Sequence, residues 1–150
     1  MKAEYIVLHH SLTEDGSAVS WGAIRRYHML DQGMVDIGYH FGIERIGVFP
    51  EILMGRMWDE RGAHCKQGGM NNRSLGICFV GNYDLIPVPY GLWQRGIDLC
   101  LRLMDMFQIP VANVISHHSV APHKTCPGLL FNIDAFRQQL TDRRDGYAHA

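Results

Sequence analysis

The stretch Ser74–Asn82, with the sequence SLGICFVGN, decides how the rest of the chain can be arranged. It is a nearly continuous apolar run, and such a run is typical of a strand that is buried on both faces of a sheet. A strand of this kind needs other parts of the chain over both of its faces. We therefore expect it at the centre of the sheet.

Shorter strands and amphipathic helices alternate along the rest of the chain. Apolar runs typical of strands occur at residues 5–8, 36–43, 48–53 and 113–116. Apolar residues recur at helical spacing at residues 19–30, 93–107 and 133–140. Ser20 is a suitable N-cap for the first helix, and Gly47 suits a hairpin turn between two of the strands. The order predicts one α/β domain, with a central mixed β-sheet flanked by helices.

Two segments are predicted to lie outside this regular structure. Residues 62–72 are rich in Gly and Asn and predict an exposed loop. From Thr141 onward the chain is polar and is expected to fray. We therefore assign residues 1–140 to the folded domain and residues 141–150 to a polar C-terminal tail.

Composition narrows the possible functions. The chain has 150 residues, a net charge of −1 and no long Lys/Arg run, so no electrostatic argument points to nucleic acid. No apolar stretch reaches the roughly 18 residues that a membrane span needs. Of the four cysteines, Cys78 and Cys100 are expected to be buried thiols. For Cys65 the sequence leaves open whether it is a buried thiol of this kind.

Histidine is abundant, with nine residues, and it clusters near the C-terminal end of the domain. The segment Ser116–Gly128, SHHSVAPHKTCPG, places imidazoles, an amine and a thiol close together. Imidazole nitrogen and thiolate sulfur are preferred zinc ligands, and a catalytic zinc normally has three protein ligands. The third must come from elsewhere, and either His9 or His10 is a candidate, because only one of two neighbouring strand residues points to a given face. Spacing alone leaves buried structural histidines equally open.

Four motifs in this order carry a family resemblance. They are Val7–Ser11, Ile37–Phe41, Ser74–Tyr83 and His117–Gly128. Over about Tyr5 to Leu140 the chain resembles the zinc-dependent N-acetylmuramoyl-L-alanine amidases, which are related to phage T7-type lysozyme and to peptidoglycan recognition proteins. The resemblance implies the fold of that family and makes residues 1–140 an amidase catalytic domain.

The resemblance also implies roles for individual residues. His9, His117 and Cys126 correspond to the zinc ligands of the family. Tyr39 matches the tyrosine beside the metal, and Lys124 matches the catalytic lysine of the phage-type enzymes. These two side chains would donate hydrogen bonds to a developing oxyanion, which is an effective form of catalysis.

Other positions carry looser predictions. His64 falls where the family often has a histidine in the substrate groove. Trp58 lies in a polar, loop-like stretch, so stacking on substrate and packing are both open. The segment from His117 to Cys126 is one residue longer than in the phage lysozyme, which leaves open whether His123 or Lys124 faces the metal. The three remaining histidines beside these motifs are predicted to be hydrogen-bonding or core residues: His10, His40 and His118.

Three functions are compatible with this pattern. The leading one is hydrolysis of the amide bond between N-acetylmuramic acid and L-alanine, in peptidoglycan or in soluble muropeptides. A non-catalytic peptidoglycan-binding module is the second, although such members generally lack the cysteine ligand. The third is a structural zinc site closed by Cys65 or His123. Because the N-terminus lacks the features of a secretory signal, we expect a cytoplasmic monomer, released by a separate pore if it is a phage-type endolysin.

Overall fold

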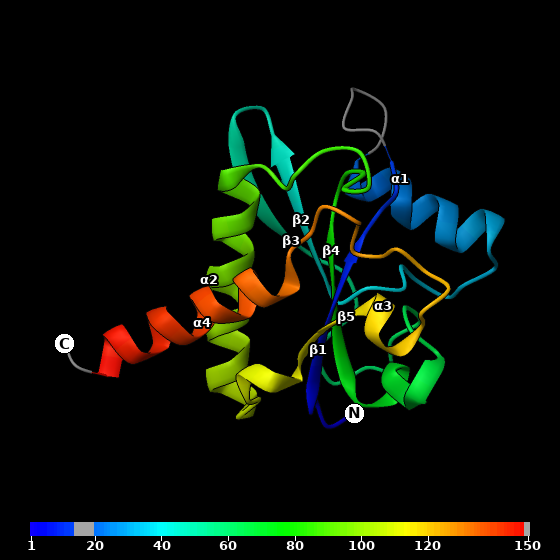
Figure 1. Cartoon of the computed structure of the whole chain (residues 1–150). Coiled ribbons are helices and arrows are strands. Elements are labelled where there is room, and N and C mark those ends of the chain that lie inside the picture. The colour runs from blue at the N-terminus through cyan, green and yellow to red at the C-terminus, as the bar shows by residue number, and fades with distance from the viewer. Residues whose placement is uncertain (14–19, 149–150) are drawn as a thin grey trace.

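The computed structural model describes residues 1–13 and 20–148 and is built on a five-stranded mixed sheet (Figure 1). The strands lie in the order β3-β2-β4-β1-β5. Their bounds are β1 Tyr5–His10, β2 Phe41–Ile46, β3 Phe49–Met54, β4 Ser74–Phe79 and β5 Val114–Ser116. The β1–β4, β1–β5 and β2–β4 pairs are parallel, and only the β2–β3 hairpin pairs antiparallel. The predicted mixed sheet is therefore confirmed.

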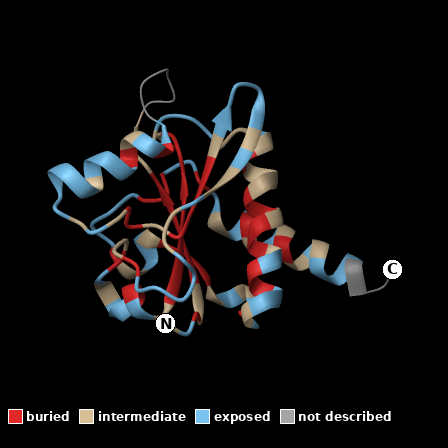
Figure 2. Cartoon of the chain, turned by 180° about the vertical axis from the view of Figure 1, so that it is seen from behind, coloured by how far each residue is buried: buried red, intermediate tan, exposed pale blue. Residues whose placement is uncertain are grey.

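Strand β4 lies between β2 and β1, and all six of its residues are buried. This confirms the central position expected for the run that begins at Ser74. The hairpin turn at Gly47 is also confirmed. This glycine has a φ of 62°, a value that residues with a Cβ atom rarely adopt. The buried strands form the centre of the molecule, as Figure 2 shows.

Helices cover both faces of the sheet, as Figure 1 shows. The α-helices are α1 Trp21–Arg26, α2 Tyr90–Phe107, α3 His117–Val120 and α4 Ile133–Ala148. The other helical segments are a π-helix, η1 Tyr27–Asp31, and two 3-10 helices, η2 Gln67–Asn72 and η3 Val111–Asn113. Ser20 caps α1 as predicted, because its hydroxyl accepts a hydrogen bond from the Ala23 N–H at 3.3 Å.

The two faces of the sheet have different cores. Alternate residues of β1 and β4, such as Ile6 and Ile77, belong to the large cluster that includes α2 and α4. On the opposite face, Val7 packs in a small cluster with Cys65, and Cys78 packs in another with Trp21. The opposite face therefore has a thinner apolar cover, and this is the face on which polar side chains gather.

Two local predictions are corrected. The loop expected at residues 62–72 is not fully exposed: Cys65, Met70 and Asn71 are buried, and the Asn71 amide oxygen accepts hydrogen bonds from two main-chain N–H groups. The histidine-rich segment contains one short helix, α3, which begins directly after Ser116.

The chain also does not fray at Thr141, since α4 continues to Ala148. An ion pair of 2.7 Å between Arg143 and Asp98 ties this polar extension to α2. The extension would otherwise have little apolar surface to hold it. No helix in the described part of the chain has the length and apolar character needed to span a membrane.

Candidate metal centre

Three side chains from distant parts of the sequence meet at the carboxyl ends of β1 and β5. His9 lies near the end of β1, His117 follows β5 directly, and Cys126 comes from the loop after α3. One donor atom from each lies within 4.8 Å of the other two. His9 Nδ1 is 3.5 Å from the Cys126 sulfur, and the rings of His9 and His117 have centroids 4.6 Å apart. The parallel pairing of β1 with β5 produces this convergence.

Strand alternation separates the roles of His9 and His10. His9 points to the same face as Val7, whereas His10 points to the opposite face, where its Nδ1 accepts a hydrogen bond of 3.1 Å from the Tyr83 N–H. His10 still serves the centre through its main chain, because its N–H donates to the Cys126 sulfur at 3.3 Å. An N–H aimed at sulfur favours the thiolate form that a metal requires.

Main-chain hydrogen bonds close the loop that carries His117 and Cys126. The His118 N–H donates to the Cys126 carbonyl at 2.8 Å, and His118 Nδ1 donates to the Lys124 carbonyl at 2.6 Å.

His40 is also held by hydrogen bonds, because its Nδ1 accepts from the Gly76 N–H and its Nε2 donates to the Glu60 carbonyl. The prediction that His10, His40 and His118 are hydrogen-bonding residues is confirmed.

The electrostatics of the three donors fit a metal ion. Burial, followed by the neighbouring His64 and His117, holds the pKa of His9 well below its usual value. Burial, Lys124 and His123 lower the pKa of His117 to about 4, so both imidazoles are neutral at pH 7. Burial raises the pKa of the Cys126 thiol to about 12, and a bound metal would offset this by favouring the thiolate.

The three donors have no fourth protein donor beside them in the described part of the chain. Among the described residues only these three donors form such a group, so neither Cys65 nor His123 closes it. The buried Nε2 of His117 has no hydrogen-bond partner in the described part of the chain, so no protein group competes for that atom. Two imidazoles, one thiolate and an open position are the arrangement of a catalytic zinc site, whereas structural sites have four protein ligands.

Tyr39 packs against the centre. Its ring centroid is 5.1 Å from that of His9 and 6.2 Å from that of Trp21. Burial raises the pKa of Tyr39 well above its ordinary value, with further contributions from Cys78 and Cys126, so the hydroxyl keeps its proton. Tyr39 is therefore a donor beside the metal ligands.

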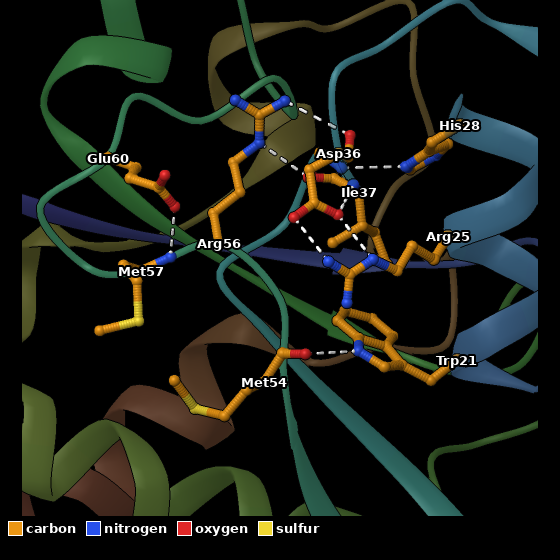
Figure 3. A network of polar contacts seen from close by, with 10 residues as sticks. Trp21, Arg25, His28, Asp36, Ile37, Met54, Arg56, Met57 and Glu60 are labelled. Carbon is orange, nitrogen blue, oxygen red and sulfur yellow. Dashed lines mark hydrogen bonds and ion pairs between the residues drawn. The ribbon is translucent and has the colours of Figure 1, made fainter. Parts of the chain in front are cut away.

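A polar network that the sequence did not reveal fixes the segment preceding Tyr39 (Figure 3). The Arg56 guanidinium donates to the carbonyl of Ile37 at 2.7 Å and to that of Asp36 at 3.4 Å. The carboxylate of Asp36 binds Arg25 of α1 at 2.7 Å. His28 accepts a hydrogen bond of 3.0 Å from the Gly38 N–H. These contacts join residues of three separate segments, so no local pattern could have indicated them.

A cavity of about 260 Å³ opens beside the centre, and its lining includes His64, His117 and Lys124. Lys124 is exposed and faces this cavity, whereas His123 lines a second cavity of about 300 Å³, which Lys124 also borders. The arrangement favours Lys124 as the neighbour of the centre. Trp58 is 41% exposed in a turn after β3 and does not line either cavity.

His64 does more than line the cavity. Its Nδ1 lies 2.9 Å from His9 Nε2, and its Nε2 lies 3.4 Å from the Ser74 carbonyl. Burial, followed by His40, lowers the pKa of His64 to about 3, so this imidazole is neutral. No sequence pattern indicates the direct contact between His64 and His9, which are 55 positions apart.

Comparisons with known proteins agree with this geometry. A sequence model of the family described as N-acetylmuramoyl-L-alanine amidase matches residues 1–129. The endolysin of Klebsiella phage KP32 is 37% identical over 125 residues, which cover 81% of this chain and 78% of that protein. The endolysin amidase LysCS from Clostridium intestinale superposes with a TM-score of 0.81 and 28% identity over 93% of this chain and 84% of that chain.

A solved structure of a peptidoglycan recognition protein is also similar. A variant of Drosophila PGRP-LB in complex with tracheal cytotoxin has a TM-score of 0.72 and 26% identity, over 86% of this chain and 77% of that chain. The same fold thus occurs in phage endolysins, bacterial amidases and peptidoglycan recognition proteins.

Proposed function

The chain belongs to the N-acetylmuramoyl-L-alanine amidase family, and from this premise we propose that it cuts the bond between N-acetylmuramic acid and L-alanine with a zinc ion held by His9, His117 and Cys126. It is an amidase of peptidoglycan, as its relatives indicate. The observation that carries the proposal is the approach of three donor atoms to within 4.8 Å of one another. The donor set is the one expected for a hydrolytic zinc.

The side chains around the centre supply the other parts of the reaction. When bound, zinc polarises a carbonyl group and makes water a strong nucleophile near pH 7. The ammonium of Lys124, exposed at the cavity, attracts the developing negative charge on the carbonyl oxygen. The Tyr39 hydroxyl, which keeps its proton, is a second hydrogen-bond donor beside the centre. The cavity that His64, His117 and Lys124 line would receive the stem peptide.

The Cys126 ligand separates this proposal from a non-catalytic binding module. Such a module would bind peptidoglycan without cleaving it and would not need a metal. The decisive experiment incubates the pure protein with purified sacculi, with and without a chelator, and measures new amino termini at L-alanine. We expect release that stops with chelator and returns with added zinc. Binding to sacculi without release would contradict the proposal and support the module.

Metal analysis tests the ligand set directly. We expect about one zinc per chain in the wild type and much less in Cys126→Ser. His123→Ala is the matched control, because it changes an imidazole in the same loop that lines the second cavity. Zinc loss in the control with zinc retained in Cys126→Ser would overturn the assignment.

The proposal also includes the kind of substrate, which is either polymeric peptidoglycan or soluble muropeptides. An endolysin-type enzyme should cleave polymeric sacculi, as the phage relatives named endolysins suggest. A recycling enzyme should prefer soluble anhydro-muropeptides, and a comparison of kcat/KM on the two substrates distinguishes them. We expect the sacculus to be cleaved.

A further inference from the structure

One ring nitrogen of His9 faces the Cys126 sulfur, and the other faces away from it. Within the described part of the chain, His64 is the side chain that hydrogen-bonds to this second nitrogen. The two nitrogens of His9 have different neighbours: Nδ1 is 3.5 Å from the Cys126 sulfur, and Nε2 is 2.9 Å from His64 Nδ1. The nitrogen that faces Cys126 is the one available to a shared metal. Its partner nitrogen is the one that must carry the proton.

The hydrogen-bond partners of His64 determine its own tautomer. Its Nε2 faces the Ser74 carbonyl at 3.4 Å, and a carbonyl oxygen can only accept. The proton of a neutral His64 therefore lies on Nε2, which leaves a lone pair on Nδ1. That lone pair faces His9 Nε2, so His9 must donate there. The chain of bonds runs from the Ser74 carbonyl through both rings and leaves His9 Nδ1 free to bind a metal.

The fold holds the His64 ring closely. A Cβ atom on Gly76 of β4 would lie 2.6 Å from two His64 ring atoms, and one on Gly62 would lie 2.5 Å from the ring. Both distances are too short for any side chain, so these glycines make the space that the imidazole fills. The Asn71 amide oxygen fixes the backbone beneath it by accepting from the His64 N–H at 2.8 Å.

We propose that His64 is a positioning residue that fixes His9 in the tautomer with the proton on Nε2 and so directs His9 Nδ1 toward the metal. This inference rests on the proposed zinc centre and gives His64 a role other than holding substrate. Metal-binding histidines commonly donate their second N–H to an acceptor, and loss of that acceptor typically costs roughly 10–100-fold in metal affinity or activity.

Two substitutions at position 64 separate positioning from bulk. In His64→Asn the side-chain oxygen can take the place of Nδ1 and accept from His9. In His64→Gln the amide reaches the place of Nε2 and can still donate to the Ser74 carbonyl, but no acceptor remains beside His9. Zinc affinity, measured by competition with a chromophoric chelator, should fall roughly 10–100-fold in His64→Gln and stay within about threefold of wild type in His64→Asn.

A spectroscopic measurement reads the tautomer itself. Long-range ¹H–¹⁵N correlation spectra of the zinc-loaded protein should show His9 protonated at Nε2 and metal-bound at Nδ1. Lys66→Ala is the control, since Lys66 borders the same cavity without an observed contact to His9. It should keep the wild-type affinity and spectrum. Melting of the metal-free variants checks that each one is folded.

The outcomes are distinct. If His64→Gln binds zinc as tightly as the wild type, or if His9 carries its proton on Nδ1, the positioning role is wrong. If His64→Gln raises KM while zinc affinity is unchanged, His64 acts on the substrate instead, which also overturns the inference. If the wild type itself binds no zinc, the proposed metal centre fails and this inference fails with it.

Discussion

At the scale of single residues, the proposed centre offers two hydrogen-bond donors to a negatively charged oxygen. Tyr39 lies against His9, and Lys124 lines the cavity beside His117. Neither contributes an atom to the group of metal donors. Their loss should therefore affect turnover more than metal content.

Replacing Tyr39 by Phe removes the hydroxyl and keeps the ring that packs on His9 and Trp21. Loss of one oxyanion donor typically lowers kcat by about 10²–10³-fold, and we expect a fall of that order with zinc content unchanged. Steady-state hydrolysis and metal analysis of the same preparation measure both. Tyr27→Phe, on the exposed π-helix, is the control. Full activity in Tyr39→Phe would remove the hydroxyl from the mechanism.

Replacing Lys124 by Gln removes one of the two lysine charges at the cavity, which Lys66 also borders. We expect kcat to fall by about 10²–10³-fold, because an ammonium ion is a stronger donor to an oxyanion than a neutral amide. His123→Gln is the matched variant in the same loop and should keep most of the activity. The opposite ranking of the two variants would mean that His123, not Lys124, faces the substrate.

At this scale, some contacts between side chains cannot be predicted from the sequence. Strand alternation predicts only that one of His9 and His10 faces the site, and the family resemblance, not the alternation, selected His9. The contact between His64 and His9 depends on the glycines at positions 62 and 76, which leave space for a ring. That space is a property of the folded backbone, and a sequence pattern does not express it.

At the scale of elements, the glycine in the middle of β4 links the sheet to the proposed centre. Gly76→Ala would bring a Cβ atom to 2.6 Å from the His64 ring. We expect the ring to be displaced, with zinc affinity lowered more than in His64→Asn, and stability lowered as well, since overpacking typically costs about 1–3 kcal/mol. Chelator competition and urea unfolding report the two effects. A variant that melts and binds zinc like the wild type would show that Gly76 does not hold the His64 ring closely.

The polar end of α4 permits a test of the predicted domain boundary. Removing residues 141–150 keeps Leu140, which is fully buried, and deletes the partner of Asp98. A partly exposed ion pair contributes about 0–1 kcal/mol, so we expect the shortened chain to fold and to hydrolyse peptidoglycan, with Tm lower by only a few degrees. Calorimetry measures the shift. Failure of the shortened chain to fold would place the boundary of the domain beyond residue 140.

Elements with strong periodicity could be predicted from the sequence. The central strand β4 and helix α2 are signalled by a continuous apolar run and by apolar residues stepping along one helical face. The 3-10 helix η2 could not be predicted, because Gly68 and Gly69 both have positive φ and the segment is held by the buried Asn71. The part of α4 beyond Leu140 forms an ion pair with α2, a tertiary contact that a local pattern does not show.

At the scale of the whole molecule, the proposed metal joins strands β1 and β5 to the loop that follows. A ligand that binds only the folded state stabilises it by about 2.7 kcal/mol at a hundredfold excess over Kd. For a protein of this size we expect zinc to raise Tm by several degrees. The same addition should leave Cys126→Ser unchanged. Identical melting of the wild type with zinc and with chelator would contradict a metal bound by the native fold.

The three metal donors come from opposite ends of the polypeptide, since His9 and Cys126 are 117 positions apart. A chain that is still being synthesised on the ribosome would therefore lack the proposed metal site until the segment after α3 has emerged and β5 has paired with β1. The same holds for a fragment left by a protease that separates the two ends. Each incomplete copy would therefore lack the proposed metal site and the hydrolysis that depends on it.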